Sequence, residues 1–150
     1  MSIVVGSVKE LLLRDLSKLK VEIQSYSAEK EIWELRGEIK NSAGTLCLHL
    51  CGNLQHYIGA VLGNSGYIRN REAEFSKRNI SKVELLKDVN ETIRLVSLVL
   101  NKLDESITGK IYPEEVFGNP MTTGYFLIHL AGHLNYHLGQ INYHRRLNQN

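Results

Sequence analysis

The sequence predicts an all-α protein, a four-helix bundle that forms a single domain over residues 1–150. Three observations favour this fold class. The chain has only two prolines, Pro113 and Pro120, and both lie in one short region. Apolar residues recur at spacings of three and four over four long stretches, which is the pattern of amphipathic helices. No hairpin dipeptide lies between alternating apolar runs, and four helices of this length typically pack as a bundle.

The first helix is predicted from about Gly6 to Gln24, where the apolar positions form one stripe. Its members are Val8, Leu11, Leu12, Leu16, Leu19 and Ile23. A short amphipathic segment from Glu29 to Leu35 follows and carries the single tryptophan, Trp33. The second helix is predicted from about Ser42 to Leu62, because a glycine-rich cluster at residues 63–66 can end it.

The third helix is predicted from about Ser81 to Ser106, and Ser81 with Glu84 forms a capping-box pattern at its start. The fourth is predicted from about Thr122 to Leu147, with Pro120 just outside its first turn. The connections after the second and third helices span roughly 15 to 18 residues, whereas bundle connections usually take about 2 to 8. Such connections can cross the end of a bundle or line the opening of a functional site.

The bulk properties limit the classes of function. The formal net charge of +2 is too small to indicate a nucleic-acid partner. Charged residues interrupt the apolar N-terminal stretch, so no signal peptide is predicted, and no run approaches the length of a membrane span. Cys47 and Cys51 lie one helical turn apart, a poor geometry for a disulfide. We therefore predict a cytoplasmic protein with reduced thiols and no membrane partner.

All six histidines lie on the second and fourth predicted helices. They are His49, His56, His129, His133, His137 and His144. Residues at i and i+4 share a helix face about 6 Å apart along the axis, so two such imidazoles can bind one ion. The fourth helix offers two overlapping pairs, His129 with His133 and His133 with His137. The second helix can supply one further ligand, either His49 or His56.

Three neutral imidazoles suit Zn, Ni, Cu or Fe, and three protein ligands leave a coordination position for water or substrate. Helical geometry alone leaves both pairs on the fourth helix open, and both candidates on the second. The two cysteines are each about 200° around the helix from His49. We therefore expect Cys47 and Cys51 to pack in the interior rather than to bind the metal.

Several motifs resemble those of the DinB/YfiT-like proteins. The segment His133-x-x-x-His137-x-Gly139-Gln140 resembles the HxxxHxGQ segment on the last helix of that family. His49, in a helix after a tryptophan-bearing segment, is similar to the position of the family's first ligand. The stretch from Gly52 through Gly66 to Phe75 resembles one branch of the group. The resemblance implies an up-down-down-up bundle in which the connection between the second and third helices crosses over.

The resemblance also implies one divalent transition metal, Zn, Ni or Fe, bound by His49, His133 and His137. His129 is additional to the family pattern, so a site built on His129 and His133 stays an alternative. Family members with an assigned activity are mainly metal-dependent transferases that use a low-molecular-weight thiol such as bacillithiol or mycothiol. The resemblance therefore implies a thiol S-transferase with a small-molecule thiol or electrophile as its partner.

Other polar residues can complete such a site. Asn53 and Tyr57, one and two turns beyond His49, are candidates for hydrogen bonding at its rim, and His129 and Gln140 for a rim or supporting role. Two arginines in the connection, Arg69 and Arg71, are candidates for clamping an anionic group. The other interpretation of these arginines is that they pair with the nearby glutamates at 72 and 74.

A second hypothesis is a non-enzymatic protein, either a metal-binding sensor or a dimeric, stress-related module. In that case the histidines would hold the bundle together, and its faces would mediate association. A homodimer is expected under either hypothesis, because small bundles with wide apolar stripes often bury one face against a copy.

Overall fold

The computed structural model describes residues 3–149, and this part of the chain is all-helical apart from its connections. The bundle consists of α1 (Ile3–Gln24), α2 (Ala43–Leu54), α4 (Lys82–Lys102) and α5 (Thr123–Asn148). The shorter helical segments are η1 (Glu29–Trp33), η2 (Gln55–Ala60), α3 (Arg71–Ser76) and η3 (Glu105–Gly109). Within residues 3–149 the only β pairing is an isolated bridge between Ile111 and Thr122. The predicted all-α class is confirmed.

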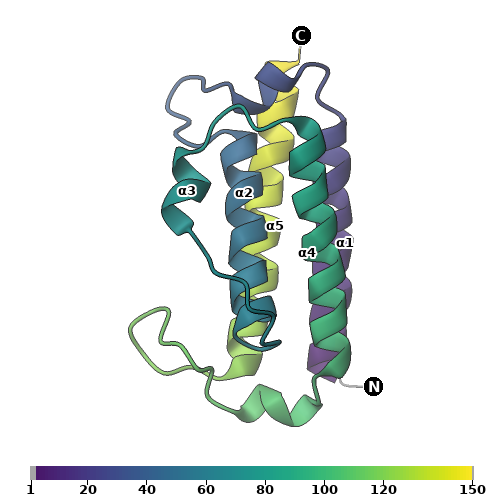
Figure 1. Ribbon diagram of the computed structural model, residues 1–150, viewed down its shortest axis with the longest axis vertical. Helices are drawn as coiled ribbons and strands as arrows, with labels where there is room; N and C mark the ends of the chain where they lie inside the picture. Colours follow the sequence, from purple (N-terminus) through teal and green to yellow (C-terminus); the bar gives the residue numbers. More distant parts are fainter. Residues whose placement is uncertain (1–2, 150) are drawn as a thin grey trace.

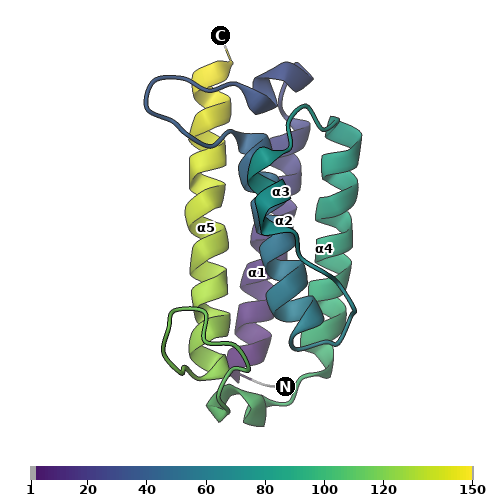
Figure 2. The same cartoon turned by 60° about the vertical axis from the view of Figure 1, so that its left-hand side comes forward.

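The four long helices run up, down, down and up (Figure 1). Helix α1 contacts α4 and α5, and α2 contacts the same two helices, so α1 and α2 lie on one diagonal of the bundle. Because α2 and α4 are parallel, the chain between them must return along the whole bundle. Residues 61–81 make this crossover along the outer side of α2, and α3 packs there (Figures 1 and 2). The predicted helix order and crossover are therefore correct.

Side-chain caps fix where three of the long helices begin. The hydroxyl groups of Ser42, Ser81 and Thr122 each accept a hydrogen bond from the backbone N–H three residues later. These caps satisfy N–H groups that the first turn leaves unpaired, so the predicted starts are correct to within one residue. The third helix, however, ends at Lys102, four residues earlier than expected, because the chain becomes extended and Asp104 caps η3 instead.

The second helix does not continue as a regular α-helix, in contrast to the prediction of one helix up to the glycine cluster. Residues Gln55–Ala60 form a π-helical turn, and such turns occur frequently at functional sites. This turn lies close against α4. A Cβ atom at Gly59 or Gly63 would collide with Leu95 or Val99 of α4. The two glycines therefore allow the end of this helix to approach α4 closely.

The core extends along the bundle and is built mostly from the predicted apolar stripes, although Leu11 of the first stripe is 40% exposed. Its fully buried side chains include Leu12, Leu16, Leu19, Ile23, Leu50, Leu85, Val89, Leu134 and Ile141. His144 is also buried: its Nδ1 lies 2.7 Å from the Tyr26 hydroxyl, and its Nε2 lies 2.7 Å from the backbone oxygen of Glu34. His144 thus joins α5 to the segment that follows α1. Among the described residues, no helix combines the length and hydropathy that a membrane crossing requires.

Candidate metal centre

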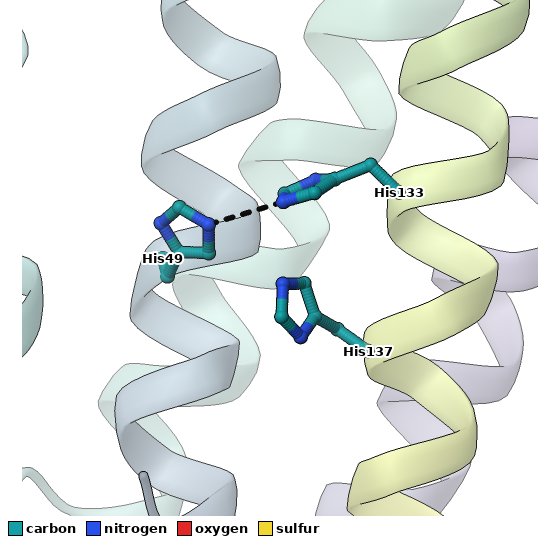
Figure 3. A group of neighbouring side chains, drawn as sticks. All are labelled: His49, His133 and His137. Atoms are coloured by element: carbon teal, nitrogen blue, oxygen red, sulfur yellow. Dashed lines mark hydrogen bonds between the residues drawn. The ribbon is translucent and has the colours of Figure 1, made fainter.

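Three of the six histidines meet between α2 and α5 (Figure 3). His49 of α2 faces His133 and His137, which lie one turn apart on α5. One ring nitrogen of each lies within 4.8 Å of those of the other two, and no other set of three His, Cys, Asp or Glu side chains in residues 3–149 does so. The Nε2 atoms of His49 and His133 are 3.2 Å apart. Two nitrogens at about 2.0–2.1 Å from one tetrahedral ion would be about 3.3–3.4 Å apart.

Glu74 of α3 holds the ring of His49 from the side away from α5. Its Oε1 accepts a hydrogen bond from His49 Nδ1 at 3.1 Å. Arg69 donates to both carboxylate oxygens of Glu74, at 2.8 and 2.9 Å. Because a carboxylate can only accept, the proton of His49 resides on Nδ1, and Nε2 keeps its lone pair towards α5. Metal-binding histidines are usually oriented by such a carboxylate.

The position of Glu74 depends on a glycine in α2. A Cβ atom at Gly52 would collide with the Oε2, Cδ and Cγ atoms of Glu74. The lack of a side chain at this position lets α3 bring the carboxylate against His49. Burial raises the pKa of Glu74, but the hydrogen bonds from His49 and Arg69 outweigh that effect and leave the pKa below its ordinary value. Glu74 is therefore ionised at neutral pH.

The two histidines of α5 have different surroundings. His137 Nδ1 lies 2.7 Å from the Gln140 side-chain oxygen. This oxygen accepts a hydrogen bond from the Nδ1–H, which leaves Nε2 free to bind a metal. The Nδ1 atom of His133 is buried without a hydrogen-bond partner among the described residues, as is the Oδ1 atom of Asn53. Such atoms are rare in folded proteins, and a water, an ion or a functional role is their usual explanation.

The histidines of α5 are neutral at physiological pH. Burial lowers the pKa of His133 to about 3, helped by the neighbouring His137, His49, His129 and Arg69, which oppose a further positive charge. Burial likewise lowers the pKa of His137 and of His129. Neutral imidazoles keep the lone pairs that a metal requires, so His133 and His137 need no deprotonation to bind a cation near pH 7.

We expect the metal-free protein to lose stability as the pH falls from 7 towards 4. A histidine in the unfolded chain titrates near 6.5, whereas the pKa of His133 in the folded protein is about 3. Between these values the unfolded state binds more protons, so each decrease in pH favours unfolding. Urea denaturation of chelator-treated protein at several pH values measures the slope. A His133→Ala variant should show a shallower slope, and equal slopes would contradict the assignment.

A cavity of about 460 Å³ opens beside His49 and His133. Its volume lies within the range of small-molecule sites, about 300–1,000 Å³. Its lining comes from α2, η2, α5 and both long connections, and consists of His49, Asn53, Tyr57, Arg69, Arg71, Val116, Phe117, Phe126, His129, Leu130 and His133. No carboxylate is among these residues. The two long connections thus line the mouth of a site, as their length had suggested.

Residues 7–150 match the family described as "Protein of unknown function (DUF1572)". The chain belongs to this family. It is also similar to the crystal structure of a conserved protein from Enterococcus faecalis, with a TM-score of 0.75 and 19% sequence identity over 98% of this chain and 97% of that chain. At this identity the similarity establishes a common fold alone. No curated protein was found to match the sequence.

In this DUF1572 protein the remaining predicted residues have distinct positions. The ring of His129 is stacked on Phe126, and its centroid is 6.1 Å from that of His133, so it lies outside the group of three. His56 lies elsewhere, with its Nε2 3.1 Å from a carboxylate oxygen of Glu114. The fold therefore brings together His49, His133 and His137, and not the alternative sets that include His129 or His56.

The two candidate clamp residues differ. Arg69 is bound to Glu74, as the pairing interpretation expected, whereas Arg71 is exposed, with its guanidinium 5.0 Å from the ring centroid of Phe75. Cys47 and Cys51 are free and fully buried, as predicted. Sequence reasoning did not assign Glu74 a role beside His49. Its only signal was a position close to the arginines.

Proposed function

We propose that this DUF1572 protein binds one divalent transition metal, Zn, Ni or Fe, through His49, His133 and His137, and that it is a DinB-like transferase using a low-molecular-weight thiol. The observation that carries the proposal is the convergence of three imidazole nitrogens beside a cavity. These donors fit such a metal in number, type and spacing. The similarity of the last helix to the HxxxHxGQ segment supports the same ligand set.

In this reaction the chain's own residues would orient the metal ligands. Glu74 and Gln140 orient His49 and His137, so that the Nε2 atoms face one point. When bound, the metal would supply positive charge that lowers the pKa of a coordinated thiol. The absence of a carboxylate from the cavity lining favours a nucleophile such as a thiol, which can ionise without a strong general base.

The cavity would bind the rest of the reactants. Arg71 is exposed at its edge and can pair with an anionic group of the thiol or of the electrophile. Phe117 and Phe126 offer aromatic surface, while the buried Oδ1 of Asn53 is available to a donor. Tyr57 and His129 complete the rim.

We expect metal-loaded protein to accelerate the conjugation of a small thiol with monochlorobimane, which becomes fluorescent as the thioether forms. Glutathione, cysteine, bacillithiol and mycothiol should be tested separately with Zn-, Ni- and Fe-loaded protein. The acceleration should disappear after chelation and in a His133→Ala variant. If none of these thiols reacts faster with stoichiometrically loaded protein, the transferase proposal fails. The protein would then be a metal-binding sensor or scaffold.

A further inference from the structure

The outer face of α5 is unusual for a surface helix. From Thr123 to His144 the helix contains no Asp, Glu, Lys or Arg. Five large apolar or aromatic side chains on this face are between 58% and 65% exposed: Tyr125, Ile128, Tyr136, Tyr143 and Leu147. Gly132 and Gly139 lie on the same face at the intervening turns, since each residue advances the helix by about 100°. We call these seven residues the α5 stripe.

Within residues 3–149 no helix covers the α5 stripe, although the connections border both of its ends, beside Tyr125 and beside Tyr143 and Leu147. The buried face of α5 packs against α1 and α2, and Figure 2 shows the helix at the edge of the bundle with no further helix beyond it. Surface helices normally present charged residues to solvent, and contiguous apolar patches on a monomer usually mark an interaction site. An uncharged stripe along six turns therefore indicates a surface that is covered in the working protein.

The two glycines of the α5 stripe support this interpretation. A glycine inside a helix costs about 1 kcal/mol relative to alanine, and such a cost is normally offset by close packing. A Cβ atom at Gly132 or Gly139 would have no neighbour within 4 Å in this chain. Neither glycine therefore makes room for another part of the same molecule. Small residues at these positions would instead let a second helix approach from outside.

We propose that the α5 stripe pairs with the α5 stripe of a second copy, antiparallel, about a two-fold axis near Tyr136. Reading along the helix in either direction from Tyr136, the stripe has first a glycine, then a large side chain, then a second large side chain, at nearly equal spacings. Under this symmetry Gly132 lies opposite Gly139 of the other copy, Ile128 opposite Tyr143, and Tyr125 opposite Leu147. Such self-complementarity is what an isologous interface requires. The seven residues of the stripe carry no charge, and the Arg146 guanidinium lies beside it, 5.5 Å from the Tyr143 ring centroid.

The dimensions suit a dimer. A helix of 26 residues is about 39 Å long and about 10 Å wide, which gives roughly 400 Å² per copy. Next to the stripe, a groove between α1 and α5 adds surface, with Val21 58% exposed at its edge and Leu138 in its lining. The two stripes alone would bury roughly 800 Å² in total, and the groove would bring the buried area towards the roughly 1,000 Å² expected of a specific interface. This proposal does not rest on the metal or on the proposed reaction.

Light scattering and sedimentation velocity on the full chain test the proposal. At about 100 μM the protein should have twice the mass of one chain. The double variant Ile128→Glu/Tyr143→Glu should raise the dimer dissociation constant at least about a hundredfold, because it buries carboxylates against apolar side chains. Both positions are exposed in the monomer, so circular dichroism should show an unchanged helix content. Val83→Glu, at a 74% exposed position of α4, is the matched control and should remain dimeric.

Cross-linking tests the position of the axis. In a Tyr136→Cys variant the two introduced thiols should lie close enough to form an intermolecular disulfide under a mild oxidant, whereas Val83→Cys should not cross-link. The native Cys47 and Cys51 are buried and do not interfere. A monomeric wild-type protein at 100 μM, a dimer that persists in the double variant, or a dimeric Tyr136→Cys protein that fails to cross-link would each overturn the proposal.

Discussion

Replacing His133 with alanine is expected to abolish stoichiometric metal binding. His133 is the central residue of the candidate centre, because its Nε2 lies 3.2 Å from that of His49 and its ring centroid lies 4.6 Å from that of His137. Removing it leaves two ligands on different helices. From the total binding energy of structural zinc sites, the loss of one ligand corresponds to an affinity decrease of about a hundredfold or more.

The measurement is the metal content of protein purified without a histidine tag, followed by competition titration with a chelator. His129→Ala is the matched control, since His129 is the preceding histidine on α5 and lies outside the group of three. The control should retain metal at the wild-type affinity. Stoichiometric metal in the His133→Ala variant would exclude the site as assigned. Loss of metal in the His129→Ala variant would favour the alternative pair instead.

Replacing Glu74 with glutamine is expected to weaken both metal binding and the fold. The change removes the negative charge that holds His49 and neutralises Arg69, whose side chain is only 10% exposed. Losing an orienting partner of a metal-binding histidine typically reduces affinity 10–100-fold. A buried arginine left without its counter-ion costs about 3 kcal/mol of the free energy of unfolding.

Glu72→Gln is the control for this variant, because Glu72 is exposed on the same short helix. It should change neither quantity measurably. A Gly52→Ala variant offers a second route to the same loss of affinity, since its Cβ atom would displace the carboxylate of Glu74 while leaving every ligand in place. If Glu74→Gln binds metal as tightly as the wild-type protein, Glu74 does not orient the centre.

Local sequence signals predicted the bundle well and its connections poorly. Apolar periodicity located the four long helices, and a capping-box pattern marked the start of the third, because both signals depend on neighbours within a few residues. The π-helical turn at Gln55–Ala60 was missed, since it depends on close packing against Leu95 and Val99 of α4. Helix α3 was also missed. Its start has a local signal, because Asn70 caps it by accepting a hydrogen bond from the Ala73 N–H, but its six residues are too few for an apolar period and pack against α2.

The same distinction applies to the centre. Helical spacing alone reduced six histidines to one from the second helix and an adjacent pair from the fourth. The choice of His49 and of the pair His133 and His137 came from the family resemblance, and the structure brings these three together. The role of Glu74 could not be foreseen, because its contact with His49 spans 25 residues and depends on the crossover that places α3 beside α2.

The two buried cysteines have a practical consequence. The hydrogen bond between Cys51 and Cys47, together with burial, raises the pKa of Cys51. Both thiols are fully buried, so neither can meet a solvent-borne reagent while the bundle is closed. The rate at which a thiol-specific label enters the chain would consequently report how often the molecule opens globally. The labelling rate of the two native cysteines is thus a probe of opening that requires no engineered residue.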